Sequence, residues 1–159
     1  MARGKEKGIT VEQAVKDAFE CYGEKSEALI PILLKVNTEL GFLPDEVLKT
    51  ISEKLRIPQS QLNSVATFYK MLFTKEMGRH VVKFCESAPC HVAGGRQLWK
   101  SLKDELKLQP GETSPDGKWT LTTVSCLGLC ALGPVMMVDE DVYGNLTAES
   151  LPSIFASYQ

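Results

Sequence analysis

Apolar residues in the first half of the chain recur every three or four positions, which is the spacing of amphipathic helices. The first helix is expected to begin after Thr10, whose hydroxyl suits a helix cap. Three more are predicted at about residues 26–40, 44–55 and 59–69. Because Pro31 lies inside the second segment, we expect its first turn to be irregular or to start late. Together these segments predict a small helical bundle.

The pattern changes near Gly78 to short runs rich in β-branched residues, with helical spacing between and after them. The predicted order is β-α-β-β-β-α, with a hairpin around residues 139–141 and a last helix whose start is delayed by Pro152. Strands are expected at about residues 80–84, 119–124, 134–138 and 142–146, and helices at about 94–106 and 148–157. We therefore expect an α+β chain, with a helical bundle domain at residues 1–77 and a mixed-sheet domain at 78–159.

The composition is that of an ordinary globular protein. Of 159 residues, 43% are hydrophobic and 24% are charged, which is enough apolar material for a packed core. The net charge of −2 offers no basic footprint for nucleic acid or for an anionic membrane. No stretch approaches the roughly 20 apolar residues of a membrane-spanning helix, and the polar start lacks the apolar run of a signal peptide. We expect a cytoplasmic protein that neither binds nucleic acid nor inserts directly into a membrane.

Four of the five cysteines occur as two close pairs, Cys85 with Cys90 and Cys126 with Cys130. Each pair follows a predicted strand, and loops at strand ends often carry functional sites. Two pairs of thiolates match the requirement of a [2Fe–2S] cluster, which takes two ligands on each iron. Backbone N–H groups of these glycine-containing loops would point at the sulfurs and tune such a cluster. The pattern therefore favours a one-electron carrier.

The spacing alone leaves other cysteine chemistry open. Structural zinc also takes four cysteines, although Cys-x4-Cys is at the wide end of its usual spacing, so a zinc-binding scaffold module is the alternative. A Rieske centre needs two histidines, but His80 heads a strand and His91 directly follows Cys90. A thioredoxin-type dithiol needs Cys-x-x-Cys, which is missing. Four buried cysteines without a metal are the plain structural alternative.

The other conspicuous residues have structural interpretations. Cys21 stands alone on a predicted helix and is expected to be a core thiol. The apolar run at residues 68–73 is expected to form interdomain core, with a partner-docking surface as the alternative. The chain contains neither Gly-x-Gly-x-x-Gly nor Gly-x-x-x-x-Gly-Lys-Ser/Thr, and it shows no catalytic residue pattern. We therefore expect the substrate chemistry to take place on another chain.

The sequence around the cysteines resembles the thioredoxin-like [2Fe–2S] ferredoxin family. Members of that family include subunits of respiratory NADH dehydrogenase and of NAD(P)-linked iron-only hydrogenases and formate dehydrogenases. The resemblance is carried by FCESAPCHVAGG at residues 84–95, PDGKWTL at 115–121 and VSCLGLCALGPVMMV at 124–138, and in the helical half by ALIP at 28–31, GFLPD at 41–45 and VATFY at 65–69. One departure is Gly133, where the family more often has alanine, and we expect it to alter the packing of that loop slightly.

The resemblance implies a thioredoxin-like fold for the second domain, with Cys85, Cys90, Cys126 and Cys130 as the ligands of one [2Fe–2S] cluster. It also implies an electron-transfer subunit of an NAD(P)H-linked oxidoreductase complex of hydrogenase, formate dehydrogenase or NADH:quinone oxidoreductase type. The expected partner is a flavoprotein subunit that binds FMN and NAD(H), together with further iron–sulfur subunits. The resemblance does not separate these branches.

Overall fold

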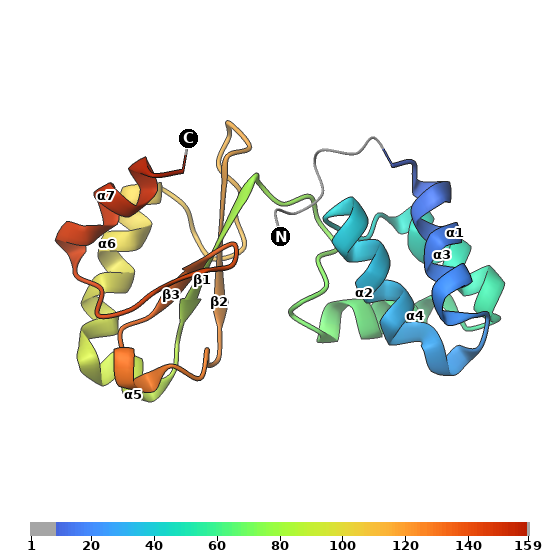
Figure 1. Cartoon of the computed structure of the whole chain (residues 1–159), viewed down its shortest axis with the longest axis horizontal. Coiled ribbons are helices and arrows are strands. Elements are labelled where there is room, and N and C mark those ends of the chain that lie inside the picture. Colours follow the sequence, from blue (N-terminus) through green and yellow to red (C-terminus); the bar gives the residue numbers. More distant parts are fainter. Residues whose placement is uncertain (1–8, 159) are drawn as a thin grey trace. The chain divides into compact units, whose positions relative to one another are not determined.

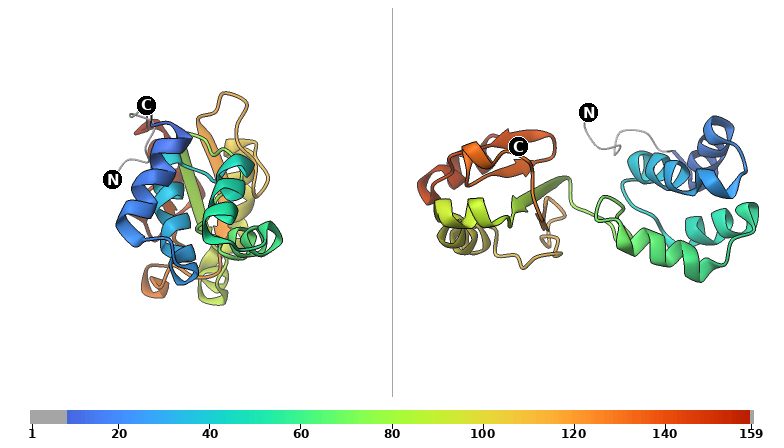
Figure 2. Two further views of the ribbon diagram at one scale, coloured as in Figure 1. Left: turned by 90° about the vertical axis from the view of Figure 1, so that its right-hand side faces the viewer. Right: turned by 90° about the horizontal axis from the view of Figure 1, so that it is seen from below.

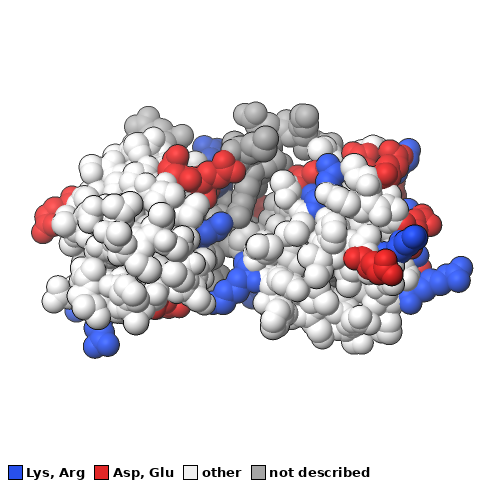
Figure 3. Space-filling view, turned by 60° about the horizontal axis from the view of Figure 1, so that its bottom comes forward, with Lys and Arg blue, Asp and Glu red and all other residues white. Residues whose placement is uncertain are grey.

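The computed structural model describes residues 9–158, and the chain divides into two compact units between Met77 and Gly78 (Figure 1). The first unit consists of helices, and the second is built around a four-stranded sheet. No helix within the described residues is long and apolar enough to cross a membrane. On the face drawn in Figure 3, basic and acidic side chains lie singly or in small groups among broad uncharged areas.

The helical unit contains the four predicted helices. They are α1 (Val11–Tyr22), α2 (Leu29–Leu40), α3 (Asp45–Leu55) and α4 (Gln59–Phe68). The Thr10 hydroxyl caps α1 by accepting a hydrogen bond from the Gln13 N–H, as predicted. A 3₁₀ turn at Ser26–Ala28 precedes α2, which confirms the irregular start expected from Pro31. Apolar side chains from all four helices form one core, with Ile32, Leu33, Val36, Val47, Ile51 and Leu62 fully buried.

One buried amide fastens the segment after α4 to this bundle. The side chain of Asn37 donates to the Met71 carbonyl (3.3 Å) and accepts from the Phe73 N–H (2.9 Å). The Leu43 N–H donates to the Phe73 carbonyl at 2.7 Å. The amide group of Asn37 and the backbone groups of Phe73 are therefore all hydrogen-bonded, as buried polar groups require.

The expectation that Cys21 is a core thiol is wrong, because its side chain is exposed. The buried stripe of α1 ends with Ala18 and Phe19. Cys21 follows Phe19 by two residues and therefore points about 200° around the helix from it. Within the apolar run at 68–73, Leu72 is buried in the helical unit, whereas Phe68 is 77% exposed. An interdomain core formed by this run stays a prediction.

The second unit has a mixed sheet with the strand order β2-β1-β3-β4. β1 pairs in parallel with β2 and antiparallel with β3, and β3 forms a hairpin with β4. The bounds are β1 (His80–Cys85), β2 (Trp119–Val124), β3 (Met136–Val138) and β4 (Asp141–Tyr143). With the helices, this arrangement confirms the predicted α+β class.

Two helices, α6 (Arg96–Leu106) and α7 (Leu151–Ala156), pack against one face of this sheet (Figures 1 and 2). Side chains alternate across a strand, so every second residue of the strands faces these helices. The resulting core contains Val82, Phe84, Leu121, Met136, Val138, Leu98, Leu102, Leu151 and Phe155. A 3₁₀ turn at Ala148–Ser150 precedes α7, which agrees with the late start expected from Pro152.

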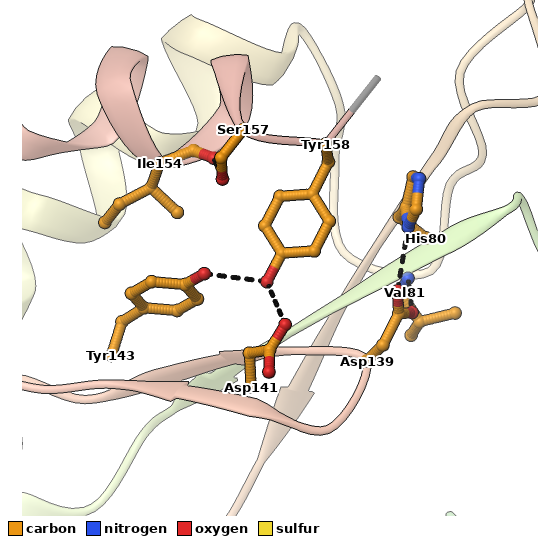
Figure 4. Close-up of polar contacts among 8 residues, drawn as sticks. All are labelled: His80, Val81, Asp139, Asp141, Tyr143, Ile154, Ser157 and Tyr158. Carbon is orange, nitrogen blue, oxygen red and sulfur yellow. Dashed lines mark hydrogen bonds and ion pairs between the residues drawn. The ribbon is translucent and has the colours of Figure 1, made fainter. Parts of the chain in front are cut away.

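Polar contacts fasten the end of the chain to the β3–β4 hairpin (Figure 4). The Tyr158 hydroxyl donates to a carboxylate oxygen of Asp141 and bonds the Tyr143 hydroxyl, both at 2.7 Å. Burial, followed by these two hydrogen bonds, raises the pKa of Tyr158. Beside them, His80 Nδ1 lies 2.7 Å from Asp139 Oδ2, which ties the start of β1 to the hairpin turn. These contacts stabilise the end of the sheet that lies opposite the cysteine pairs.

Candidate functional site

The parallel pairing of β1 with β2 brings the two cysteine pairs to one edge of the sheet. Cys85 is the last residue of β1 and stands opposite Val124, the last residue of β2. The last hydrogen bond between the two strands runs from the Glu86 N–H to the Val124 carbonyl at 2.9 Å, and the two segments separate after it. Cys126 follows Val124 by two residues, in the loop after β2. Parallel strands finish at the same edge, so the two loops begin side by side.

The first loop is more ordered than the sequence predicted. Cys90 closes a single helical turn, α5 (Ala88–Cys90), with Pro89 in a favourable early position. A π-helical turn, His91–Gly95, then leads into α6, and Gly94 within it has a φ of +103°. These turns are too short for a periodic apolar pattern to indicate them. They carry Cys90 back to the sheet, where it is buried with Cys85.

Gly95 allows the chain to pass close to Cys90. A Cβ atom added at Gly95 would lie 2.5 Å from the Cys90 carbonyl oxygen. Gly133 borders the same thiol, because a Cβ there would lie 3.5 Å from Cys90 Sγ and 3.3 Å from the Cys130 carbonyl oxygen. An alanine at position 133 would therefore fit after a small adjustment, in line with the slight effect expected for this departure from the family.

The second loop holds its two thiols at the surface. Cys126 lies in irregular backbone and Cys130 begins a 3₁₀ turn, Cys130–Leu132, and both are exposed. The Gly128 N–H donates to Cys126 Sγ at 3.3 Å, as expected for a backbone donor directed at a sulfur. Gly128 has a φ of +78°, a conformation that favours glycine. The backbone of this loop is therefore shaped around the Cys126 sulfur.

Three of the thiols have shifted pKa values, and the causes include neighbouring cysteines in each case. Burial, followed by a hydrogen bond with Cys85, raises the pKa of Cys90. The Gly128 N–H, followed by the Ser87 hydroxyl, lowers the pKa of Cys126. A hydrogen bond with Cys126 raises the pKa of Cys130. None of the five cysteines is in a disulfide.

The donor set suits a binuclear cluster, since it supplies four thiols as an inner pair and an outer pair. Within residues 9–158, no three histidine, cysteine or acidic side chains converge as the ligands of a single metal ion would. No sequence signal indicates the short helical turn Ala88–Cys90, in which Cys90 is as buried as Cys85, because one turn is too short to show in an apolar pattern.

Two segments that carry the cysteines contain no charged side chain, although the exposed Glu86 directly follows Cys85. Neither residues 87–95 nor residues 124–138 contain a lysine, arginine, aspartate or glutamate. Val92 is 89% exposed and Leu132 is 43% exposed, each two residues after a candidate ligand. Each cysteine loop therefore exposes one large apolar side chain, and exposed apolar surface is a frequent feature of interaction sites when it is contiguous.

Comparison with known proteins gives a consistent set of relatives. The sequence model of the family described as thioredoxin-like [2Fe-2S] ferredoxin matches residues 15–159. A subunit of the NADH-quinone oxidoreductase of Escherichia coli (strain K12) is 37% identical over 147 residues, covering 92% of this chain and 89% of that protein. A corresponding NADH-quinone oxidoreductase subunit of Rhizobium meliloti (strain 1021) is 34% identical over 151 residues, covering 95% and 90%.

Among solved structures, the NAD+-reducing [NiFe]-hydrogenase in the air-oxidized state has a TM-score of 0.61 and 22% sequence identity over 72% of this chain. The match covers 20% of the hydrogenase chain, so this protein spans about a fifth of that longer chain. The H2-reduced state of the same enzyme gives a TM-score of 0.62. These likenesses concern the fold, and with the family match they confirm the expected thioredoxin-like architecture.

Replacing Gly95 with alanine is expected to impair cluster binding, because the new methyl group would collide with the Cys90 backbone. We expect less than half the wild-type iron and sulfide per chain after anaerobic purification. Gly111→Ala is the matched control. Gly111 has a positive φ, +86°, and a Cβ there would meet nothing within 4 Å. This control should cost about 1 kcal/mol of stability and leave the iron content unchanged. Equal iron content in both variants would contradict the role given to Gly95.

Proposed function

The chain belongs to the thioredoxin-like [2Fe–2S] ferredoxin family, and we propose that it is an electron-transfer subunit whose cluster is held by Cys85, Cys90, Cys126 and Cys130. A bound [2Fe–2S] cluster supplies one-electron redox chemistry. The observation that carries the proposal is the meeting of two cysteine pairs at one sheet edge, with mutual effects on their thiols. The chain itself binds, orients and partly shields the cluster.

The two cysteine pairs differ in burial, so the proposed site has a buried side and a side open to solvent. Cys85 and Cys90 are at most 2% exposed, whereas Cys126 and Cys130 are exposed. The inner pair keeps water from one side of the site, and the outer pair leaves the other side accessible. We infer that electrons enter and leave on the side of the second loop. Exposure and hydrogen bonds at this side then set the reduction potential.

The proposed setting is an NAD(P)H-linked oxidoreductase complex of NADH:quinone oxidoreductase, hydrogenase or formate dehydrogenase type. Support comes from the NADH-quinone oxidoreductase subunits among the relatives and from the match to an NAD+-reducing hydrogenase. The partner proposed is a flavoprotein subunit that binds FMN and NAD(H), with further iron–sulfur subunits beyond it. Since the chain has no nucleotide-binding motif, hydride transfer would take place on that partner. We propose that the complex works in the cytoplasm.

The surface of residues 87–95 and 124–138 is the proposed contact with the flavoprotein. Val92 follows Cys90 by two residues and Leu132 follows Cys130 by two, so contact there brings a partner close to both loops. The buried centre of a stable interface is depleted of charged residues. Burying Val92 and Leu132 would also remove exposed apolar surface from water.

The ligand assignment predicts that Cys90→Ala and Cys126→Ala each lose the cluster, because each removes one of four thiolates. Wild-type protein purified without oxygen should be red-brown, with about two irons and two sulfides per chain. Both variants should lose most of the visible absorbance and iron. Cys21→Ala is the control, since Cys21 is exposed in the helical unit, and it should keep the full cluster. A colourless wild-type protein with one zinc per chain would contradict the proposal and support the zinc-scaffold alternative.

The docking surface predicts that Val92→Glu weakens association with the flavoprotein, because burial would leave the new carboxylate unpaired. We expect about a tenfold or greater loss of the FMN that co-purifies with the tagged chain. Val142→Glu is the control, because Val142 is similarly apolar and 45% exposed but lies on β4. The proposed contact is wrong if Val92→Glu has its full iron content and retains as much FMN as Val142→Glu does.

A further inference from the structure

Two polar side chains are buried within residues 9–158, and each holds one end of the segment that connects the two units. Asn37 belongs to α2 and is 7% exposed, and Thr120 is fully buried on β2. Polar groups this deeply buried are costly unless they are hydrogen-bonded. Both side chains bond backbone groups at the ends of the connecting segment.

The first attachment lies in the helical unit and ends at Phe73. Asn37 bonds the Met71 carbonyl and the Phe73 N–H, and the Leu43 N–H donates to the Phe73 carbonyl. Leu72, between the two residues that Asn37 holds, is buried in the core of the helical unit. The chain is therefore fixed to this unit as far as Phe73.

The second attachment lies in the sheet unit and begins at Gly78. The Gly78 N–H donates to the Thr120 hydroxyl at 2.6 Å, and that hydroxyl lies 2.8 Å from the Thr113 hydroxyl. The next backbone N–H, that of Arg79, donates to the Gly117 carbonyl at 2.9 Å. The chain is therefore fixed to the sheet unit from Gly78 onward.

We propose that Asn37 and Thr120 act as a pair of clasps that limits the connector between the two units to residues 74–77. Five Cα–Cα steps separate Phe73 from Gly78, so the connector spans at most about 18 Å. Opening the first clasp would add residues 69–73, which follow α4, to the connector. A partner that binds one unit keeps the other at an effective concentration that falls as a connector lengthens. The inference goes beyond the proposed function and requires neither the cluster nor the flavoprotein.

Amide hydrogen exchange of the wild-type protein tests where the connector begins and ends. The Phe73 and Gly78 N–H groups each donate to a buried side chain, whereas those of Thr74 and Lys75 make no hydrogen bond to the residues that the structure describes. After correction for sequence, we expect exchange at Phe73 and Gly78 to be at least about tenfold slower than at Thr74 and Lys75. Equal exchange at all four positions would overturn the inference.

Trypsin cleavage tests the first clasp, because the exposed Lys70 lies in the segment that would be released. Asn37→Ala removes both hydrogen bonds of the amide and leaves the Phe73 N–H unpaired. Cleavage after Lys70 should therefore be about ten or more times faster than in the wild type. Asn63→Ala is the matched control, since Asn63 is exposed on α4 and its side chain makes no hydrogen bond within residues 9–158, and it should keep the wild-type rate. Equal rates in the two variants would refute the first clasp.

Thr120→Val tests the second clasp, because it keeps the shape of the side chain and leaves the Gly78 N–H unpaired. Exchange at Gly78 and Arg79 should become about ten or more times faster, and Thr120→Ser, which keeps the hydroxyl, should stay near the wild-type rate. Thr123→Val is the control, since Thr123 lies on the same strand and its side chain bonds none of the described residues. Unchanged exchange in Thr120→Val would overturn the inference. If Asn37→Ala does not fold, this variant and the wild-type measurement decide.

Discussion

The parallel pairing of β1 with β2 is the constraint on which the rest of the candidate site depends. Its register ends at Cys85 and Val124, so the chains separate at one point and carry one cysteine pair each. Side chains on one face of these strands pack with α6 and α7 into a buried core, and a shift by one residue would turn that face outward. The hydrophobic core thus fixes the register, and the register brings the thiols together.

The burial difference between the two pairs connects this architecture to electron transfer. Phe84, directly before Cys85, is buried and stacks on Trp99 of α6, with ring centroids 4.9 Å apart. Cys85 therefore directly follows a residue of the buried core. The second loop exposes its two thiols, and residues 124–138 contain no charged side chain. In the proposed site, the buried pair would shield one side of the cluster and the exposed pair would leave the other side open to a partner.

Sequence reasoning recovered what depends on local pattern. Helical periodicity predicted the four helices of the first unit, and β-branched runs predicted the strands. Predictions of features that depend on tertiary contacts were absent or wrong. Cys21 is exposed because of its angle on α1, and β4 ends at Tyr143, before the predicted residue 146, with Asn145 at a φ of +50°. The two cysteine loops come together because Cys85 pairs with Val124, a residue 39 positions away, and no local pattern indicates that pairing.

The proposed role requires this chain to carry one electron at a time on a two-iron cluster. The most direct measurement is stoichiometric reduction of the anaerobically purified protein, with electron paramagnetic resonance recorded at each addition of reductant. The oxidised protein should be silent, take up about one electron per two irons and give about one unpaired spin for each electron added. A protein that accepts no electron and stays silent throughout, with zinc as its metal, would contradict it.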